Sequence, residues 1–246
     1  MRKALSLATA VALTSCAATL AHAGVRLDGP PLRAPAKLDC PATSGDLTRT
    51  TQSPDGQWCD YASQRGETVR LRLAPLNGKT PWAALAPTRT QLHALVPVYR
   101  EVPTDYDDGP GDRADVDVPF VHVHADGDRA DVRLFGIFHI VGHDHGADAD
   151  KDADKDHGRK HAVVHAGPRG AEVVADEVGH NNASLVYVLA GNHRYPSGYR
   201  AVGYIAKGPV SGPLVVAEFR GPENSHRDND GGNNDIDQLI DRNLGR

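Results

Sequence analysis

The chain has 246 residues and a formal net charge of −5, with 32 acidic and 27 basic side chains. This balance gives no electrostatic signature of nucleic-acid binding, so no nucleic-acid partner is expected. The length suits one domain with appendages. Hydrophobic residues make up only 39% of the chain, which predicts a modest core with polar segments outside it.

Residues 1–23 have the features of a signal peptide. Arg2 and Lys3 supply a positive start, residues 4–20 carry no charge, and Ala-His-Ala at 21–23 is a small-x-small cleavage motif. A retained membrane-spanning helix is the alternative, although this Ala- and Thr-rich stretch is weakly apolar for an anchor. Cleavage after Ala23 predicts a periplasmic or secreted protein, with no later stretch long and apolar enough to span a bilayer.

A second processing route involves Cys16. Residues 13–16, Leu-Thr-Ser-Cys, resemble a lipobox, in which Cys16 would become the lipid-bearing first residue of a lipoprotein. The apolar run continues past this cysteine to Ala23, which favours ordinary signal cleavage. A lipid anchor at Cys16 remains the alternative.

Cleavage after Ala23 leaves two cysteines, Cys40 and Cys59. An even pair in an oxidising compartment predicts a disulfide. Closing a loop of about 20 residues is worth roughly 3 kcal/mol in the chain-entropy model. Metal binding by this pair is the alternative, but neither cysteine has a CxxC partner.

The next segments follow from proline content and hydrophobic periodicity. Residues 24–37 are proline-rich and predict an extended linker. Residues 38–220 are then expected to form a single β-rich domain, in which residues 68–73 alternate as a half-buried strand. Thr80 and a proline after it indicate a helical segment near 81–96, kinked at Pro87 or beginning after it.

An internal repeat marks the centre of the chain. Residues 121–132 and 162–173 share a valine-rich stretch, His-Ala, a four-residue turn and Ala-acid-Val. Alternation on both sides of a glycine-containing turn predicts a β-hairpin for each copy. The repetition favours two stacked hairpins of one sheet, or two coils of a short solenoid.

Three apolar runs at 184–190, 199–206 and 214–220 predict a three-stranded meander. The expected fold is therefore mainly β, with antiparallel hairpins and this meander in a sandwich-like or short solenoid arrangement.

Residues 221–246 form a polar tail with a short C-terminal helix, capped by Asn234. Its apolar face holds Ile236, Leu239, Ile240 and Leu244.

Residues 142–160 form a low-complexity, His/Asp-rich insertion that is expected to be disordered. Neutral imidazole binds Zn²⁺ and Ni²⁺ well, so these ions are the candidate ligands. The alternatives are a solvated spacer for the insertion and a plain polar strand face for the strand histidines. The candidate metal ligands are His143, Asp144, His145, His157 and His161 in and beside the insertion, and His122, His124 and His165 on the predicted strands.

The other chemical motifs point away from calcium sensing and from known catalysis. Aspartates alternate from Asp148 to Asp156, but the glycine and the bidentate glutamate of an EF-hand loop are missing. The sequence has no G-x-S-x-G, H-E-x-x-H, Walker A or dinucleotide-binding motif.

We therefore expect a non-enzymatic periplasmic protein that binds divalent metal loosely through the His/Asp-rich segment. The alternative is a structural or interaction module of the cell envelope. Such a module would meet a protein partner through its sheet edges or its C-terminal helix.

Overall fold

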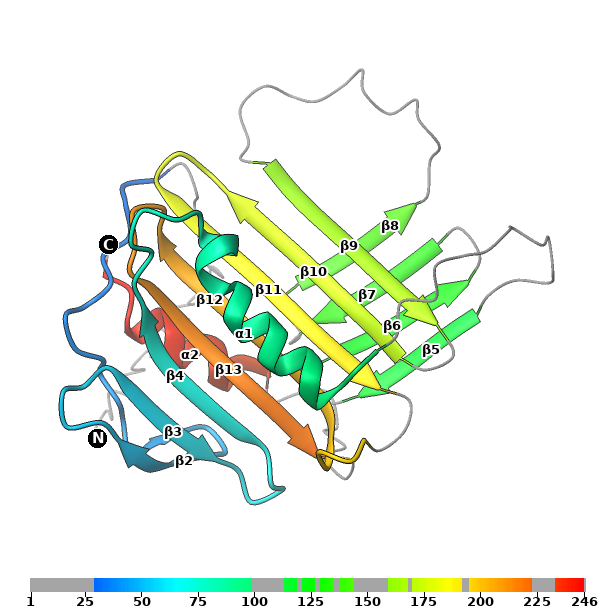
Figure 1. Ribbon diagram of the computed structural model, residues 1–246, viewed down its shortest axis with the longest axis horizontal. Helices are drawn as coiled ribbons and strands as arrows, with labels where there is room; N and C mark the ends of the chain where they lie inside the picture. Colours follow the sequence, from blue (N-terminus) through cyan, green and yellow to red (C-terminus); the bar gives the residue numbers. More distant parts are fainter. Residues whose placement is uncertain are drawn as a thin grey trace, which may run out of the picture.

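The computed structural model describes residues 29–98, 113–118, 121–126, 129–134, 138–143, 159–167, 170–191, 195–222 and 233–245. Antiparallel strands dominate these residues, in one sheet of nine strands and one of four, and two helices accompany them (Figure 1). The prediction of a mainly β fold with antiparallel hairpins, one central helix and a short C-terminal helix is confirmed. No described helix is both long and apolar enough to cross a bilayer.

The larger sheet has the strand order β1-β2-β3-β4-β13-β12-β11-β10-β9. Successive hairpins build β10 to β13, and the predicted meander is confirmed as β11, β12 and β13. The pairing of β13 with β4 is non-local and joins the N-terminal strands to this meander. The strands are β1 Thr43–Ser44, β2 Leu47–Gln52, β3 Trp58–Ala62, β4 Thr68–Ala74, β9 Arg159–Gly167, β10 Gly170–Val178, β11 Asn182–Gly191, β12 Tyr199–Pro209 and β13 Leu214–Pro222.

The central strands of this sheet are buried on both faces. Every residue of β11 is buried, because its sequence is nearly continuously apolar rather than alternating. Val186 and Ile205 are register partners in one buried cluster, while Tyr187 and Tyr204 pair on the opposite face in another. Both faces of the sheet therefore need a covering layer.

Helix α1, Pro81–Leu95, covers the face that carries Tyr187. The Thr80 side chain accepts a hydrogen bond from the Ala83 N–H, which satisfies one free donor of the first turn. The helix begins at Pro81 and runs through Pro87, so the expectation of a start after Pro87 is wrong. Leu85 and the later Leu92 are both fully buried against the sheet, and this packing on either side of Pro87 offsets its missing N–H.

Helix α2, Asn233–Arg242, covers part of the opposite face. Ile236, Leu239 and Ile240 are buried in the same cluster as Val186. The helix begins one residue before Asn234, so the expectation that Asn234 caps it is wrong by one position. The apolar face of α2 thus lies inside the protein and is not offered to a partner.

A buried ion pair fixes α2 on the sheet. The Lys207 ammonium of β12 lies 3.1 Å from the Asp237 carboxylate, and both side chains are less than a tenth exposed. Burial raises the pKa of Asp237, and the Lys207 charge opposes that shift. Asp241, which is exposed, provides a second carboxylate 3.3 Å from the same ammonium.

The N-terminal segment, for which the prolines predict a linker, is held on the sheet from residue 29 onward. The Leu32 N–H donates to the side-chain oxygen of Asn182 at 2.7 Å. The backbones of Arg33 and Gly245 exchange two hydrogen bonds of 2.9 Å. The two ends of the described chain are therefore joined on the larger sheet.

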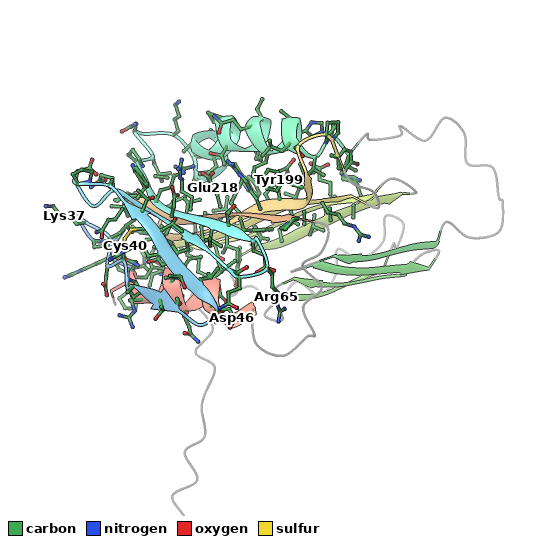
Figure 2. All side chains as sticks on the ribbon, turned by 90° about the horizontal axis from the view of Figure 1, so that it is seen from below. Lys37, Cys40, Asp46, Arg65, Tyr199 and Glu218 are labelled. Carbon is green, nitrogen blue, oxygen red and sulfur yellow. A yellow bond between two sulfur atoms is a disulfide. The ribbon has the colours of Figure 1, made fainter. Side chains whose placement is uncertain are left out.

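The smaller sheet consists of β5 Arg113–Val118, β6 Val121–Asp126, β7 Arg129–Leu134 and β8 Phe138–His143 in that order. Strand β5 lies close to β9, β10 and β11. Figure 2 shows α1 on one side of the larger sheet, with α2 and the smaller sheet on the other. The two sheets thus form a sandwich-like pair of layers.

The two hairpins of the sequence repeat belong to different sheets. The first copy forms β6 and β7 in the smaller sheet, and the second forms β9 and β10 in the larger one. Both hairpin predictions are confirmed, but stacking in one sheet or in a solenoid is wrong. The alternation within each copy predicts which two strands pair as a hairpin, but it does not predict which sheet the hairpin joins. The first hairpin lies between β5 and β8 in the smaller sheet, and the second lies beside β11 in the larger one.

The disulfide between Cys40 and Cys59 is formed, with the two Cα atoms 6.3 Å apart. Both residues are buried in the cluster on the α2 side of the sheet. The bond ties the segment before β1 to strand β3.

Removing this disulfide tests its contribution to stability. Cys40→Ala/Cys59→Ala should lower the free energy of unfolding in urea by about 3 kcal/mol, because the unfolded chain regains loop entropy. A reductant should destabilise the native protein equally and leave the double variant unchanged. Equal stability of the oxidised native protein and the variant would contradict this account.

Candidate functional site

The smaller sheet separates charged from apolar positions by its register. Alternate residues of a strand share a face, and residues paired across strands share the same face. We define the polar face by the positions Arg113, Asp115, Asp117, His122, His124, Asp126, Arg129, Asp131, Arg133, His139, Val141 and His143. The opposite, apolar face holds Ala114, Val116, Val118, Val121, Val123, Ala125, Ala130, Val132, Leu134, Phe138, Ile140 and Gly142.

All three cross-strand rows of the polar face contain histidine: His122 and His139 lie in one, His124 in the next and His143 in the third. His122 lies between Asp117 on β5 and Arg133 on β7, and Arg133 in turn pairs with His139 on β8. His124 lies between Asp115 and Asp131, and it occupies the next row. The register thus places imidazole and carboxylate groups at adjoining positions.

The structure brings some of the predicted metal ligands together and separates others. His122, His124 and His143 share the polar face, and His143 is the last residue of β8. His161 and His165 lie instead on β9 of the larger sheet, opposite Asp176 and Glu172. The predicted ligands Asp144, His145 and His157 lie outside the described residues.

Both ends of the predicted insertion at 142–160 are strand residues. Gly142 and His143 end β8, and Arg159 and Lys160 begin β9. Residues 144–158, between these strands, lie outside the described part of the chain. The segment therefore connects the smaller sheet to the larger one.

His139, which is not among the predicted ligands, also lies on the polar face. The alternation of Phe138, His139 and Ile140 marks it as a polar-face residue of a strand, and this signal is visible in the sequence. Its row is set by the pairing of β7 with β8, which the sequence does not reveal. His139 shares its row with His122 but lies beyond Arg133.

A second group of polar side chains joins α1 to the larger sheet. The Arg72 guanidinium pairs with the Glu218 carboxylate at 2.5 Å and donates to the Thr88 hydroxyl of α1 at 2.7 Å. The Trp82 indole N–H donates to the Asp176 carboxylate at 3.1 Å. These contacts tie α1 to β4, β10 and β13, and they orient the helix over the sheet.

Two tyrosines lie beside each other under α1, with ring centres 5.7 Å apart. The Tyr187 hydroxyl donates to the Glu172 carboxylate at 3.1 Å. Burial raises the pKa of Tyr187, and the Glu172 charge raises it further. Burial also raises the pKa of Tyr204, whose hydroxyl has no hydrogen-bond partner among the described residues. Both phenols therefore stay neutral to a higher pH than a free tyrosine side chain does.

The chemistry of these two groups differs. The contacts under α1 pair each charge with a partner already on the protein, which makes them a structural clamp. Among the side chains that the structure describes, no three His, Cys, Asp or Glu groups converge on a metal position. The polar face and the segment after His143, whose side chains lie outside those that the structure describes, are the regions whose residue types suit metal binding.

Comparisons with known proteins assign neither a family nor a function to this chain. No family model matches the sequence, and no match was found among curated proteins or among solved structures.

The two tyrosines under α1 should respond differently to loss of the hydroxyl. Tyr187→Phe removes the hydrogen bond to Glu172 and should lower the free energy of unfolding by about 1–2 kcal/mol. Tyr204→Phe removes a buried hydroxyl without a partner and should be neutral or stabilising by up to about 2 kcal/mol. Urea unfolding of both variants gives the comparison. A similar loss in both would mean that Tyr204 has a partner, such as a buried water.

Proposed function

We propose that this chain is an exported, non-enzymatic protein that binds divalent transition-metal ions through the His/Asp-rich segment 143–161. The observation that carries the proposal is the anchoring of both segment ends. His143 ends β8 of one sheet, and His161 lies in β9 of the other, so each end begins from a fixed strand position.

The composition of the segment supports binding of ions such as Zn²⁺ and Ni²⁺. Imidazole is a preferred ligand for both, and carboxylates add negative charge that attracts the cation. Residues 144–158 place His145 and His157 among five alternating aspartates, so several sets of ligands can serve. A long connection orders its ligands at an entropic cost, and we therefore expect weak to moderate affinity.

Export is supported by the N-terminal sequence and by the disulfide. Residues 1–23 have the charge and cleavage pattern of a signal peptide. The bond between Cys40 and Cys59 suits an oxidising compartment, where disulfides persist. Metal ions in such a compartment are accessible to an exported protein.

Replacing the segment tests the metal-binding proposal. A Gly/Ser spacer of equal length in place of residues 144–158 should abolish the weak Zn²⁺ and Ni²⁺ binding that we expect titration calorimetry to detect in the native protein. The melting temperature should stay nearly unchanged, because the spacer leaves β8 and β9 intact. An isotherm identical to that of the native protein would refute a role for the segment.

Two matched variants identify the ligands within it. His145→Gln/His157→Gln keeps every aspartate and should weaken Zn²⁺ and Ni²⁺ binding strongly. Changing the aspartates of residues 148–156 to asparagine keeps both histidines and should have a smaller effect. Binding by the native segment should also fall below about pH 6, because imidazole must lose its proton to bind metal.

Mass spectrometry of the mature protein tests export. Cleavage after Ala23 predicts a chain that begins at Gly24, isolated from the periplasm or medium. A lipid-modified Cys16 as the first residue would establish the lipoprotein route instead. A full-length cytosolic product with reduced Cys40 and Cys59 would overturn the export proposal.

A further inference from the structure

We propose that the hairpin of β5 and β6 holds a separate site for one divalent transition-metal ion, formed by His122 and His124 with Asp115 and Asp117. The inference deepens the metal-binding function proposed above but rests on different residues. The juxtaposition that carries it is two histidines at alternate positions of one strand, each paired in register with an aspartate of the next strand.

The backbone geometry places four ligand-bearing positions in a small rectangle. His122 and His124 are two residues apart on β6, which separates their Cα atoms by about 6.6 Å. Asp117 and Asp115 lie directly across from them, at about 4.5–5.5 Å between Cα atoms. Val116 and Val123, the pair between these rows, belong to the other face. All four candidate ligands therefore share one face at adjoining positions.

The donor set suits a first-row divalent ion. Two neutral imidazoles and two carboxylates are a ligand set that Zn²⁺ accepts in tetrahedral geometry, with ligand atoms at about 2.0–2.2 Å. Their formal charge of −2 is neutralised by one such ion. Without a cation, Asp115 and Asp117 repel each other along β5, and the ion removes this repulsion.

Charges on the other neighbouring strand place the ion on the β5 side of the histidines. On β7, Arg133 pairs with His122, and its positive charge disfavours a cation beside it. Asp131 pairs in register with His124 and adds a further carboxylate-bearing position beside it. The same Arg133 separates His139 from the proposed site, so His139 is not one of its ligands.

The site is expected to bind more tightly than the segment after His143. Its ligands lie on two paired strands whose register fixes their spacing before the metal arrives. The apolar face of the smaller sheet is the face that a two-layer fold places against the larger sheet. On this principle we expect the polar face on the outer side, where ions from solvent reach it.

The test uses the full chain with the Gly/Ser spacer at 144–158, so that the segment makes no contribution. Zn²⁺ titration should still give one equivalent, and Co²⁺ should give the visible absorption of a tetrahedral site. His122→Gln/His124→Gln in this background should weaken Zn²⁺ binding by about 100-fold or more, because two direct ligands are lost. His139→Gln, a histidine change on the same face, should leave the affinity unchanged.

A gain-of-affinity variant guards against misfolding as an explanation. Arg133→Gln removes the cation next to His122 and should tighten Zn²⁺ binding severalfold. Asp115→Asn/Asp117→Asn should weaken it by about tenfold or more. Absence of Zn²⁺ binding in the spacer protein, or unchanged binding after His122→Gln/His124→Gln, would overturn the proposed sheet site. Binding by the segment is tested independently, by comparing Zn²⁺ binding of the native protein with Zn²⁺ binding of the spacer protein.

Discussion

Burial of both faces of the central strands β11, β12 and β13 is the constraint on which the rest of this fold depends. These strands are nearly continuously apolar, so each face of the larger sheet must be kept from water. Helix α1 covers one face (Figure 1). On the other side lie α2 and the smaller sheet (Figure 2). The order of the elements follows from this need, since each covering element is supplied by the chain before or after the meander.

A covering sheet has to be amphipathic, and this requirement connects the fold to the proposed chemistry. The strands β5 to β8 alternate, with mostly apolar residues at one set of positions and His, Asp and Arg, apart from Val141, at the other. The apolar set suits the interface between layers, while the polar set is left for solvent and ions. The His/Asp-rich segment then begins where the polar face ends, at His143. On the proposals above, one pattern of residues serves both packing and metal binding.

Local features were predictable from the sequence, and non-local pairings were not. The turn and alternation signals predicted both repeat hairpins and the meander, and Thr80 with the following proline indicated a helical segment near 81–96. The pairing of β13 with β4, and the separation of the two repeat hairpins into different sheets, depend on neighbours far along the chain. Amphipathicity of the tail indicated a helix over 235–244, but only packing shows that its apolar face docks on its own sheet.

The separation of faces in the smaller sheet is the central claim, and thiol accessibility measures it directly. Val123→Cys and His124→Cys each add one free thiol to a mature chain whose other cysteines, Cys40 and Cys59, are paired. In the folded protein, a thiol reagent should modify the cysteine at 124 rapidly and the cysteine at 123 only at the rate of unfolding. In denaturant, both should react equally. Faster modification at 123 than at 124 in the folded state would contradict the assignment of the two faces.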